Sequence, residues 1–129
     1  MSDQARAGAV LYAKDPARLS AFYAGALGLE VAHREDDHVL ATSSAFELVV
    51  LAIPTPIAAT IEITAPPSRR EDTPIKLVFP VASIGEVRAA AIRHSVIDPP
   101  DREWANRGAR VCDGHDPEGN VVQFRERVR

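Results

Sequence analysis

The chain of 129 residues repeats one order of expected elements: a strand, a helix and then three further strands. In the first half these are a strand at 9–13, a helix opening at Asp15-Pro16, and strands at 29–35, 38–42 and 46–53. In the second half they are a strand at 75–81, a helix running from Ser83 to His94, a short strand at 96–97, a hairpin over 104–113 and a strand at 121–126. Neither half can cover its own sheet, so the two halves are expected to pack together.

The helix starts carry the clearest local signals. Asp15 can accept a hydrogen bond from the free amides of a first turn, and a proline at the first helical position loses nothing. Ser83 and Glu86 form a capping box that opens the second helix, 68 positions after Asp15 (83 − 15). Two helices are too few to cover a parallel α/β sheet, and runs of three strands favour antiparallel hairpins. The sequence therefore predicts an α+β fold.

Residues 54–74 interrupt the repeat. Five prolines and the charged run at 69–72 indicate a linker, with one helical turn expected near Ile57 and a short edge strand at 60–64. The predicted organisation is a single domain over 1–129, with module one at 8–53, the linker at 54–74 and module two at 75–127.

Composition excludes several classes of function. The formal net charge of −3 and the pI of about 5.8 lack the basic footprint of a nucleic-acid binder. No apolar stretch is long enough to span a membrane, and no signal-peptide core stands at the N-terminus. Cys112 is the single cysteine, which excludes an intrachain disulfide and favours the reducing cytoplasm.

Two segments carry a resemblance to a known family. One runs from Tyr12 to Tyr23 (Tyr-Ala-Lys-Asp-Pro-Ala-Arg-Leu-Ser-Ala-Phe-Tyr) and on through 27–31, and the other is Asp-Pro-Glu-Gly-Asn-Val-Val-Gln-Phe at 116–124. With the repeat, they make the chain similar to the vicinal oxygen chelate superfamily, which includes glyoxalase I, extradiol dioxygenases and bleomycin-resistance proteins. The resemblance implies two βαβββ modules forming a curved mixed sheet around a concave site, helices on the outer face, and a homodimer.

The resemblance also implies where a metal would be bound. Metal-dependent relatives use four side chains, and the motif spacing places them at Gly8, Glu47, Pro74 and Gln123. Glycine and proline have no donor side chain, and two oxygen ligands do not make a tight site for a catalytic divalent ion. We therefore expect no metal and no other cofactor.

Strand alternation predicts which residues face the concave site. If Glu47 and Gln123 face it, the residues two positions away on the same strands face it too. The same alternation applies to the first strand of each module, at 9–13 and 75–81. Trp104 is expected at the mouth of the pocket. The candidate ligand-binding residues are Tyr12, Glu47, Val49, Lys76, Val78, Trp104, Gln123 and Arg125. Such a mixture of apolar walls and a few polar groups is typical of a small-molecule pocket.

Several side chains have two interpretations. Glu47 is either a ligand contact or general base, or the partner of Lys76 or Arg125 in a structural ion pair. His33 and His38 flank the Asp36-Asp37 turn and are expected to be solvated, and His115 is the histidine expected nearest to the site.

Three classes of function remain open. The first, which we favour, is a metal-independent protein that binds a small organic molecule between the modules, as drug-resistance members of the superfamily do. The second is an enzyme of lyase, isomerase or dioxygenase type, with Glu47 as base or metal ligand. The third is an interaction domain whose cavity is vestigial.

Overall fold

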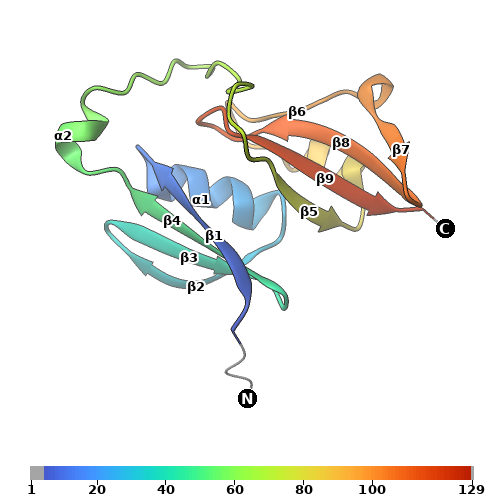
Figure 1. Cartoon of the computed structure of the whole chain (residues 1–129), viewed down its shortest axis with the longest axis horizontal. Helices are drawn as coiled ribbons and strands as arrows, with labels where there is room; N and C mark the ends of the chain where they lie inside the picture. Colours follow the sequence, from blue (N-terminus) through green and yellow to red (C-terminus); the bar gives the residue numbers. More distant parts are fainter. Residues whose placement is uncertain (1–4, 129) are drawn as a thin grey trace.

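The computed structural model describes residues 5–128, so both ends of the predicted domain lie outside it (Figure 1). The first module contains β1 (Ala7–Ala13), α1 (Pro16–Gly25), β2 (Glu30–Glu35), β3 (His38–Thr42) and β4 (Phe46–Ala52). Its sheet has the order β1-β4-β3-β2, in which β1 runs parallel to β4 and the other neighbours are antiparallel. We call this the N-terminal sheet.

The second module repeats this arrangement. It contains β5 (Leu77–Val81), α3 (Ile84–Ala89), β6 (Val96–Ile97), the 3-10 turn η1 (Pro100–Arg102), β7 (Trp104–Asn106), β8 (Ala109–His115) and β9 (Val121–Arg127). The sheet order is β5-β9-β8-β6, and the short β7 also pairs with β8. We call it the C-terminal sheet. β5 runs parallel to β9, as β1 does to β4. The predicted α+β class and the two βαβββ modules are confirmed.

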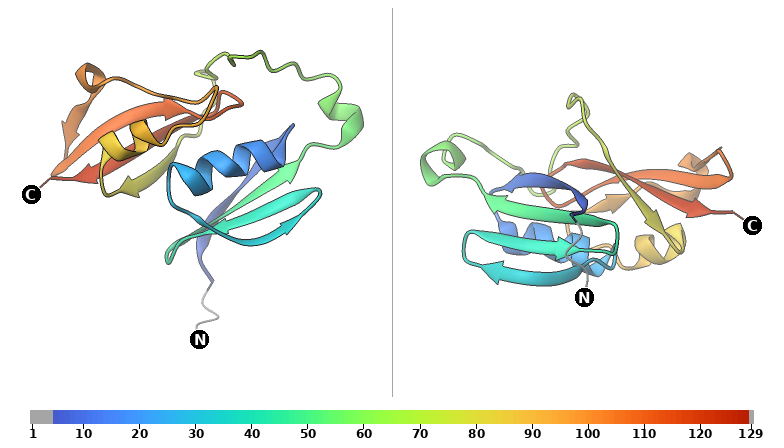
Figure 2. Two further views of the ribbon diagram at one scale, coloured as in Figure 1. Left: turned by 180° about the vertical axis from the view of Figure 1, so that it is seen from behind. Right: turned by 60° about the horizontal axis from the view of Figure 1, so that its bottom comes forward.

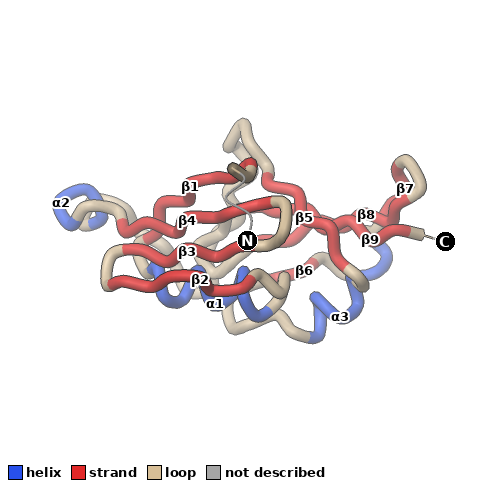
Figure 3. The backbone as a smooth tube through the Cα atoms, turned by 90° about the horizontal axis from the view of Figure 1, so that it is seen from below, coloured by secondary structure: helices blue, strands red, loops and turns tan. Residues whose placement is uncertain are grey.

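Each module has its own mixed sheet, and the two sheets lie side by side (Figure 3). Helices α1 and α3 lie on one side of this pair of sheets (Figure 3). Figure 2 shows α1 against one face of the N-terminal sheet, and no helix within residues 5–128 lies on the opposite face. We call the faces of the N-terminal and C-terminal sheets that point away from α1 and α3 the open faces. No helix in the described part of the chain is both long and apolar enough to cross a membrane.

Burial follows the alternation of the strands. On the N-terminal sheet, Leu48 and Val50 are fully buried and pack in one core with α1, whose inner face carries Leu19, Phe22 and Tyr23. On the C-terminal sheet, the corresponding buried residues are Phe79, Val122 and Phe124, together with Ile84 and Val87 of α3. These residues are the ones that alternation places on the helix-covered side.

The two modules meet where the two recognised segments come together. The hydroxyl of Tyr23 on α1 donates to Asp116 Oδ2 at 2.6 Å, and both groups are buried. The Glu118 carboxylate accepts from the backbone amides of Lys14 and Asp15 at 3.0 and 2.9 Å. Phe79 adds an apolar contact, with its ring centroid 5.8 Å from that of Tyr23. The turn at 116–119 therefore joins the second module to the start of α1.

Two expectations from the sequence were wrong. Helix α3 ends at Ala89 instead of continuing to His94: the backbone leaves helical geometry at Ala90, with a φ of −91° and a ψ of 0°. His94 itself has a φ of 70°, a left-handed conformation that an α-helix cannot contain. No strand forms at 60–64, because that segment pairs with no neighbouring strand in the described residues. The helical turn expected near Ile57 is present as α2 (Thr55–Ala58), and β5 begins at Leu77, two residues later than expected.

Candidate ligand-binding surface

The open face of the N-terminal sheet is mainly apolar where β1 and β4 form it. Its strand pairing aligns Tyr12 with Leu51 and Val10 with Val49, and these side chains point away from α1. Val10 is 55% exposed and Tyr12 58% exposed, which is unusual for large apolar and aromatic side chains in mid-strand. The face therefore offers uncovered apolar surface to a ligand or partner.

Glu47 is the polar group at one end of the β1–β4 part of this face, and His33, Glu35 and His38 lie on its β2–β3 part. It is half-buried and lies between Gly8 on β1 and Thr42 on β3 in the strand ladder. Strand β1 passes so close that a Cβ atom at Gly8 would clash with the carbonyl oxygen of Glu47 and lie 2.9 Å from its Cγ. A larger residue at position 8 would therefore require the strand to move, and Gly8 supplies no donor atom for a metal.

Neither of the cations considered as partners of Glu47 is bonded to it. Lys76 Nζ pairs with Asp113 Oδ2 at 2.9 Å, and Arg125 Nε donates to Gln123 Oε1 at 3.0 Å. Within residues 5–128, no ion pair forms on Glu47. The interpretation of Glu47 as half of a structural ion pair with Lys76 or Arg125 is therefore wrong for this structure.

The open face of the C-terminal sheet carries a chain of polar contacts. Lys76 binds Asp113, Gln123 Nε2 donates to Asp113 Oδ1 at 3.3 Å, and Arg125 donates to the amide oxygen of Gln123. That amide oxygen is the atom of Gln123 able to bind a cation, and it is already used by Arg125. Val78, 45% exposed, lies opposite Gln123 in the ladder and is the apolar residue beside this chain.

The structure places the predicted site residues in two groups and leaves Trp104 apart. The first group lies on the N-terminal sheet and comprises Tyr12, Glu47 and Val49. The second lies on or beside β5 and β9 of the C-terminal sheet and comprises Lys76, Val78, Gln123 and Arg125. Trp104 lies on β7, 42% exposed, in a cleft of ≈ 350 Å³ with Pro100, Glu103 and Arg110.

Asp113 is a central residue that the sequence analysis did not identify. It pairs with Gln123 across β8 and β9, and it lines a cleft of ≈ 230 Å³ together with Lys76, Arg69 and Arg70 from the linker. Arg69 forms a bidentate ion pair with Asp98, with Nη2 2.6 Å from Oδ1 and Nη1 3.1 Å from Oδ2. The alternation of the strand at 109–115 was the signal that could have placed Asp113 on the face of Gln123.

His115 and Cys112 lie inside the fold. His115 is 6% exposed, and its Nδ1 lies 3.0 Å from the carbonyl oxygen of Asp116. Cys112 is fully buried, as expected of a small apolar residue, and burial raises the pKa of its thiol. Neither side chain is available to a ligand on the open faces.

Comparison with known proteins gives a consistent family. The sequence profile of the glyoxalase-like domain matches residues 8–124. No curated protein matches the sequence.

Solved structures with the same fold cover nearly the whole chain. TioX from Micromonospora sp. ML1 has a TM-score of 0.67 at 16% identity and covers 97% of this chain and 100% of its own. A glyoxalase/bleomycin resistance protein from Albidiferax ferrireducens T118 has a TM-score of 0.64 at 17% identity, covering 94% and 97%. The bleomycin-binding protein of Streptomyces verticillus, in complex with copper(II)-bleomycin, has a TM-score of 0.58 at 17% identity, covering 98% of both chains. With a profile match over most of its length, the chain belongs to the glyoxalase-like domain family.

Proposed function

We propose that this protein binds a small organic molecule on its open sheet faces, without a metal ion at Gly8, Glu47, Pro74 and Gln123. The observation that carries the proposal is that one sheet face presents exposed Val10 and Tyr12 together with a half-buried Glu47. This Glu47 has no cationic partner in the described residues. A half-buried carboxylate without a cationic partner among the described residues is free to accept a hydrogen bond from a ligand.

The polar groups suggest the class of ligand. An aromatic or aliphatic body suits Tyr12, Val49 and Val78, and a donor or cationic group on the ligand suits Glu47. Lys76 and Arg125 on the other sheet suit a carboxylate or carbonyl oxygen at the far end. We therefore favour a polar-tipped aromatic molecule or a small organic acid. The bleomycin-binding protein supports this proposal by its fold and by the organic ligand in its structure.

A fluorescence titration tests the proposal. Anilinonaphthalene sulfonate, an anionic probe for apolar surface that we call the apolar probe, is expected to bind the native protein. Tyr12→Ser is expected to weaken that binding because it removes an exposed ring from the open face. Ile57→Ser is the matched control, since Ile57 is 55% exposed but lies on α2. Equal binding by the native protein and Tyr12→Ser, with weaker binding by Ile57→Ser, would reject the site. Native mass spectrometry of freshly purified protein would show a molecule that is already bound.

A second candidate is an enzyme of the same family, of lyase, isomerase or dioxygenase type. The carboxylate of Glu47 favours it, because a general base needs a lone pair that can accept a proton, and no ion pair forms on this carboxylate among residues 5–128. A metal-dependent form of this candidate would need donors that Gly8 and Pro74 do not have. Loss of turnover in Glu47→Gln, with probe binding kept, would favour the enzyme over the binding protein.

We also propose that the protein is a homodimer in the cytoplasm. Exposed Val10, Tyr12 and Val78 lie on sheet faces that no described helix covers, and a two-fold dimer is the commonest assembly that buries such surface. The single, buried Cys112 suits a reducing compartment.

A further inference from the structure

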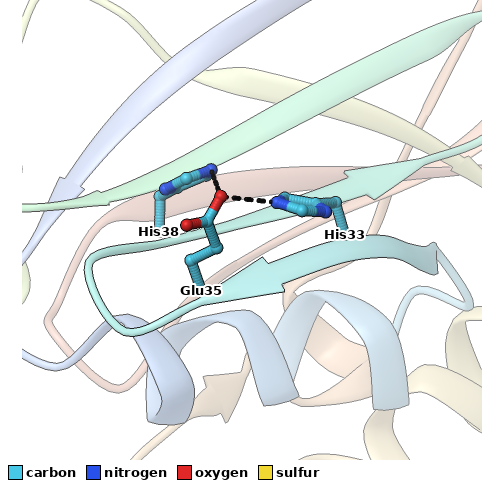
Figure 4. Close-up of side chains that lie close together, drawn as sticks. All are labelled: His33, Glu35 and His38. Carbon is cyan, nitrogen blue, oxygen red and sulfur yellow. Dashed lines mark hydrogen bonds and ion pairs between the residues drawn. The ribbon is translucent and has the colours of Figure 1, made fainter.

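Three side chains with metal-binding atoms converge at the outer edge of the N-terminal sheet (Figure 4). His33 Nε2 lies 2.7 Å from Glu35 Oε2, and His38 Nε2 lies 3.8 Å from the same oxygen. One ligand atom from each of the three residues falls within 4.8 Å of the others. We propose that this hairpin cluster is a binding site for a divalent transition-metal ion.

The hairpin itself brings the three residues together. Glu35 on β2 is the direct ladder partner of His38 on β3, and paired residues point to the same side of a sheet. His33 lies two residues before Glu35 on the same strand, so alternation directs it to that side as well. The positions are fixed by the backbone ladder of β2 and β3, which the two-residue turn at 36–37 closes.

The spacing suits a metal ion. Zinc binds nitrogen and oxygen ligands at about 2.0–2.2 Å, so two ligands of a tetrahedral ion are about 3.3 Å apart. The distances of 2.7 and 3.8 Å to Glu35 Oε2 lie on either side of that value. Rotation of exposed side chains is enough to reach the bound geometry, since His33 and Glu35 are more than half exposed.

Asp37 orients one of the two imidazoles. Its Oδ1 lies 2.8 Å from His38 Nδ1, and because an ionised carboxylate only accepts, Nδ1 must carry the proton. Nε2 of His38 is then the ring nitrogen that faces Glu35 and the centre of the cluster. A carboxylate behind a metal-binding histidine has this same orienting role in established metal sites.

The ligand set indicates which ions would bind. Two imidazoles and one carboxylate favour Zn²⁺, Co²⁺, Ni²⁺ or Cu²⁺ over Mg²⁺ or Ca²⁺, which prefer oxygen ligands. Three protein ligands leave a coordination position for water or another molecule. The cluster lies on β2 and β3, whereas Gly8 and Glu47 lie on β1 and β4, so it is a separate site that does not depend on the proposed ligand-binding function.

Calorimetric titration of the full chain, without an affinity tag, tests this site. Zn²⁺ or Co²⁺ alone is expected to bind at about one ion per chain, and Mg²⁺ is expected not to bind. His33→Asn and His38→Asn should each weaken binding by more than about tenfold, and Asp37→Asn should weaken it by about tenfold. His94→Asn is the matched control, because His94 lies in the second module and asparagine tolerates its positive φ.

The titrations distinguish an ion held by the hairpin from an ion held elsewhere on the chain. Absence of saturable binding, or binding that survives in both His33→Asn and His38→Asn, would overturn the proposal. Loss of binding in Glu47→Gln with His38→Asn unaffected would instead place the ion on β4. Circular dichroism without metal should be the same for all variants, since the three side chains are not part of the core. Binding of the apolar probe should persist in His33→Asn, because His33 lies on the edge strand β2, the strand of this sheet farthest from Tyr12 on β1, so the two sites can fail independently.

Discussion

At the scale of a single residue, substitution of Glu47 distinguishes a ligand-binding role of its carboxylate from a structural one. Because no cation pairs with it among the described residues, Glu47→Gln is expected to change the stability of the fold by less than about 0.5 kcal/mol, as at an ordinary surface position. The same change should alter the affinity for the apolar probe, because it removes the negative charge from the open face. A thermal melt and a probe titration of the one variant measure both effects.

A structural role for Glu47 would give a different result. Loss of one partner from a buried ion pair leaves the other charge unpaired and costs about 1–3 kcal/mol. Glu103→Gln provides the comparison, since it removes the partner of Arg88 from an ion pair whose carboxylate is 9% exposed. If Glu47→Gln lowered stability as much as Glu103→Gln did, with probe affinity unchanged, the binding role would be rejected.

The sequence predicted the strand face of individual residues better than it predicted their contacts with residues on neighbouring strands. Alternation from Glu47 and Gln123 predicts that Tyr12 and Val78 face the ligand site, and in the structure both side chains are exposed. It did not identify Asp113, because the partner of Gln123 depends on the register of β8 against β9, and no local pattern encodes that register. The sequence showed His33 and His38 on either side of the turn at 36–37, but their convergence with Glu35 depends on the pairing of β2 with β3.

At the scale of elements, local signals succeeded where tertiary contacts reinforced them. Asp15 caps α1 as predicted, with its Oδ1 accepting from the amide of Arg18 at 3.1 Å, and Ser83 Oγ accepts from the amide of Glu86 at 3.1 Å. The end of α3 was missed because Ala90 and Ala91 favour a helix by propensity, while the chain must turn to enter β6. Propensity is a weak prior that tertiary context overrides.

The contact between α1 and the turn after β8 makes stability depend on pH. Burial raises the pKa of the Asp116 carboxyl above its usual value, although Tyr23 and Asn120 donate hydrogen bonds to it. The folded state therefore holds this proton more tightly than the unfolded chain does. Its contribution to stability is fully present below the unfolded pKa and is lost as pH rises through the folded pKa.

Asparagine at position 116 does not titrate, so the stability lost in Asp116→Asn is expected to be larger near about pH 3.5 than near about pH 7. Urea denaturation at the two pH values measures the difference. Asp101→Asn, at an exposed position in η1, is the control and should show no such change. A loss for Asp116→Asn that grows with pH would mean that the hydrogen bonds from Tyr23 and Asn120 outweigh burial.

At the scale of the whole molecule, the two open faces lie on the side away from α1 and α3 and carry uncovered Val10, Tyr12 and Val78 (Figure 3). Monomeric proteins rarely leave large apolar patches uncovered, so we expect a second copy to cover at least part of them. Light scattering at micromolar concentration should then give 27.8 kDa (2 × 13.9 kDa).

Val10→Asp should shift the mass toward 13.9 kDa, because it would place a charge in a desolvated interface. Ile57→Asp adds the same charge at a residue of equal exposure on α2 and should leave the dimer intact. A native mass of 13.9 kDa, or dissociation by Ile57→Asp but not by Val10→Asp, would show that the open faces do not form the interface.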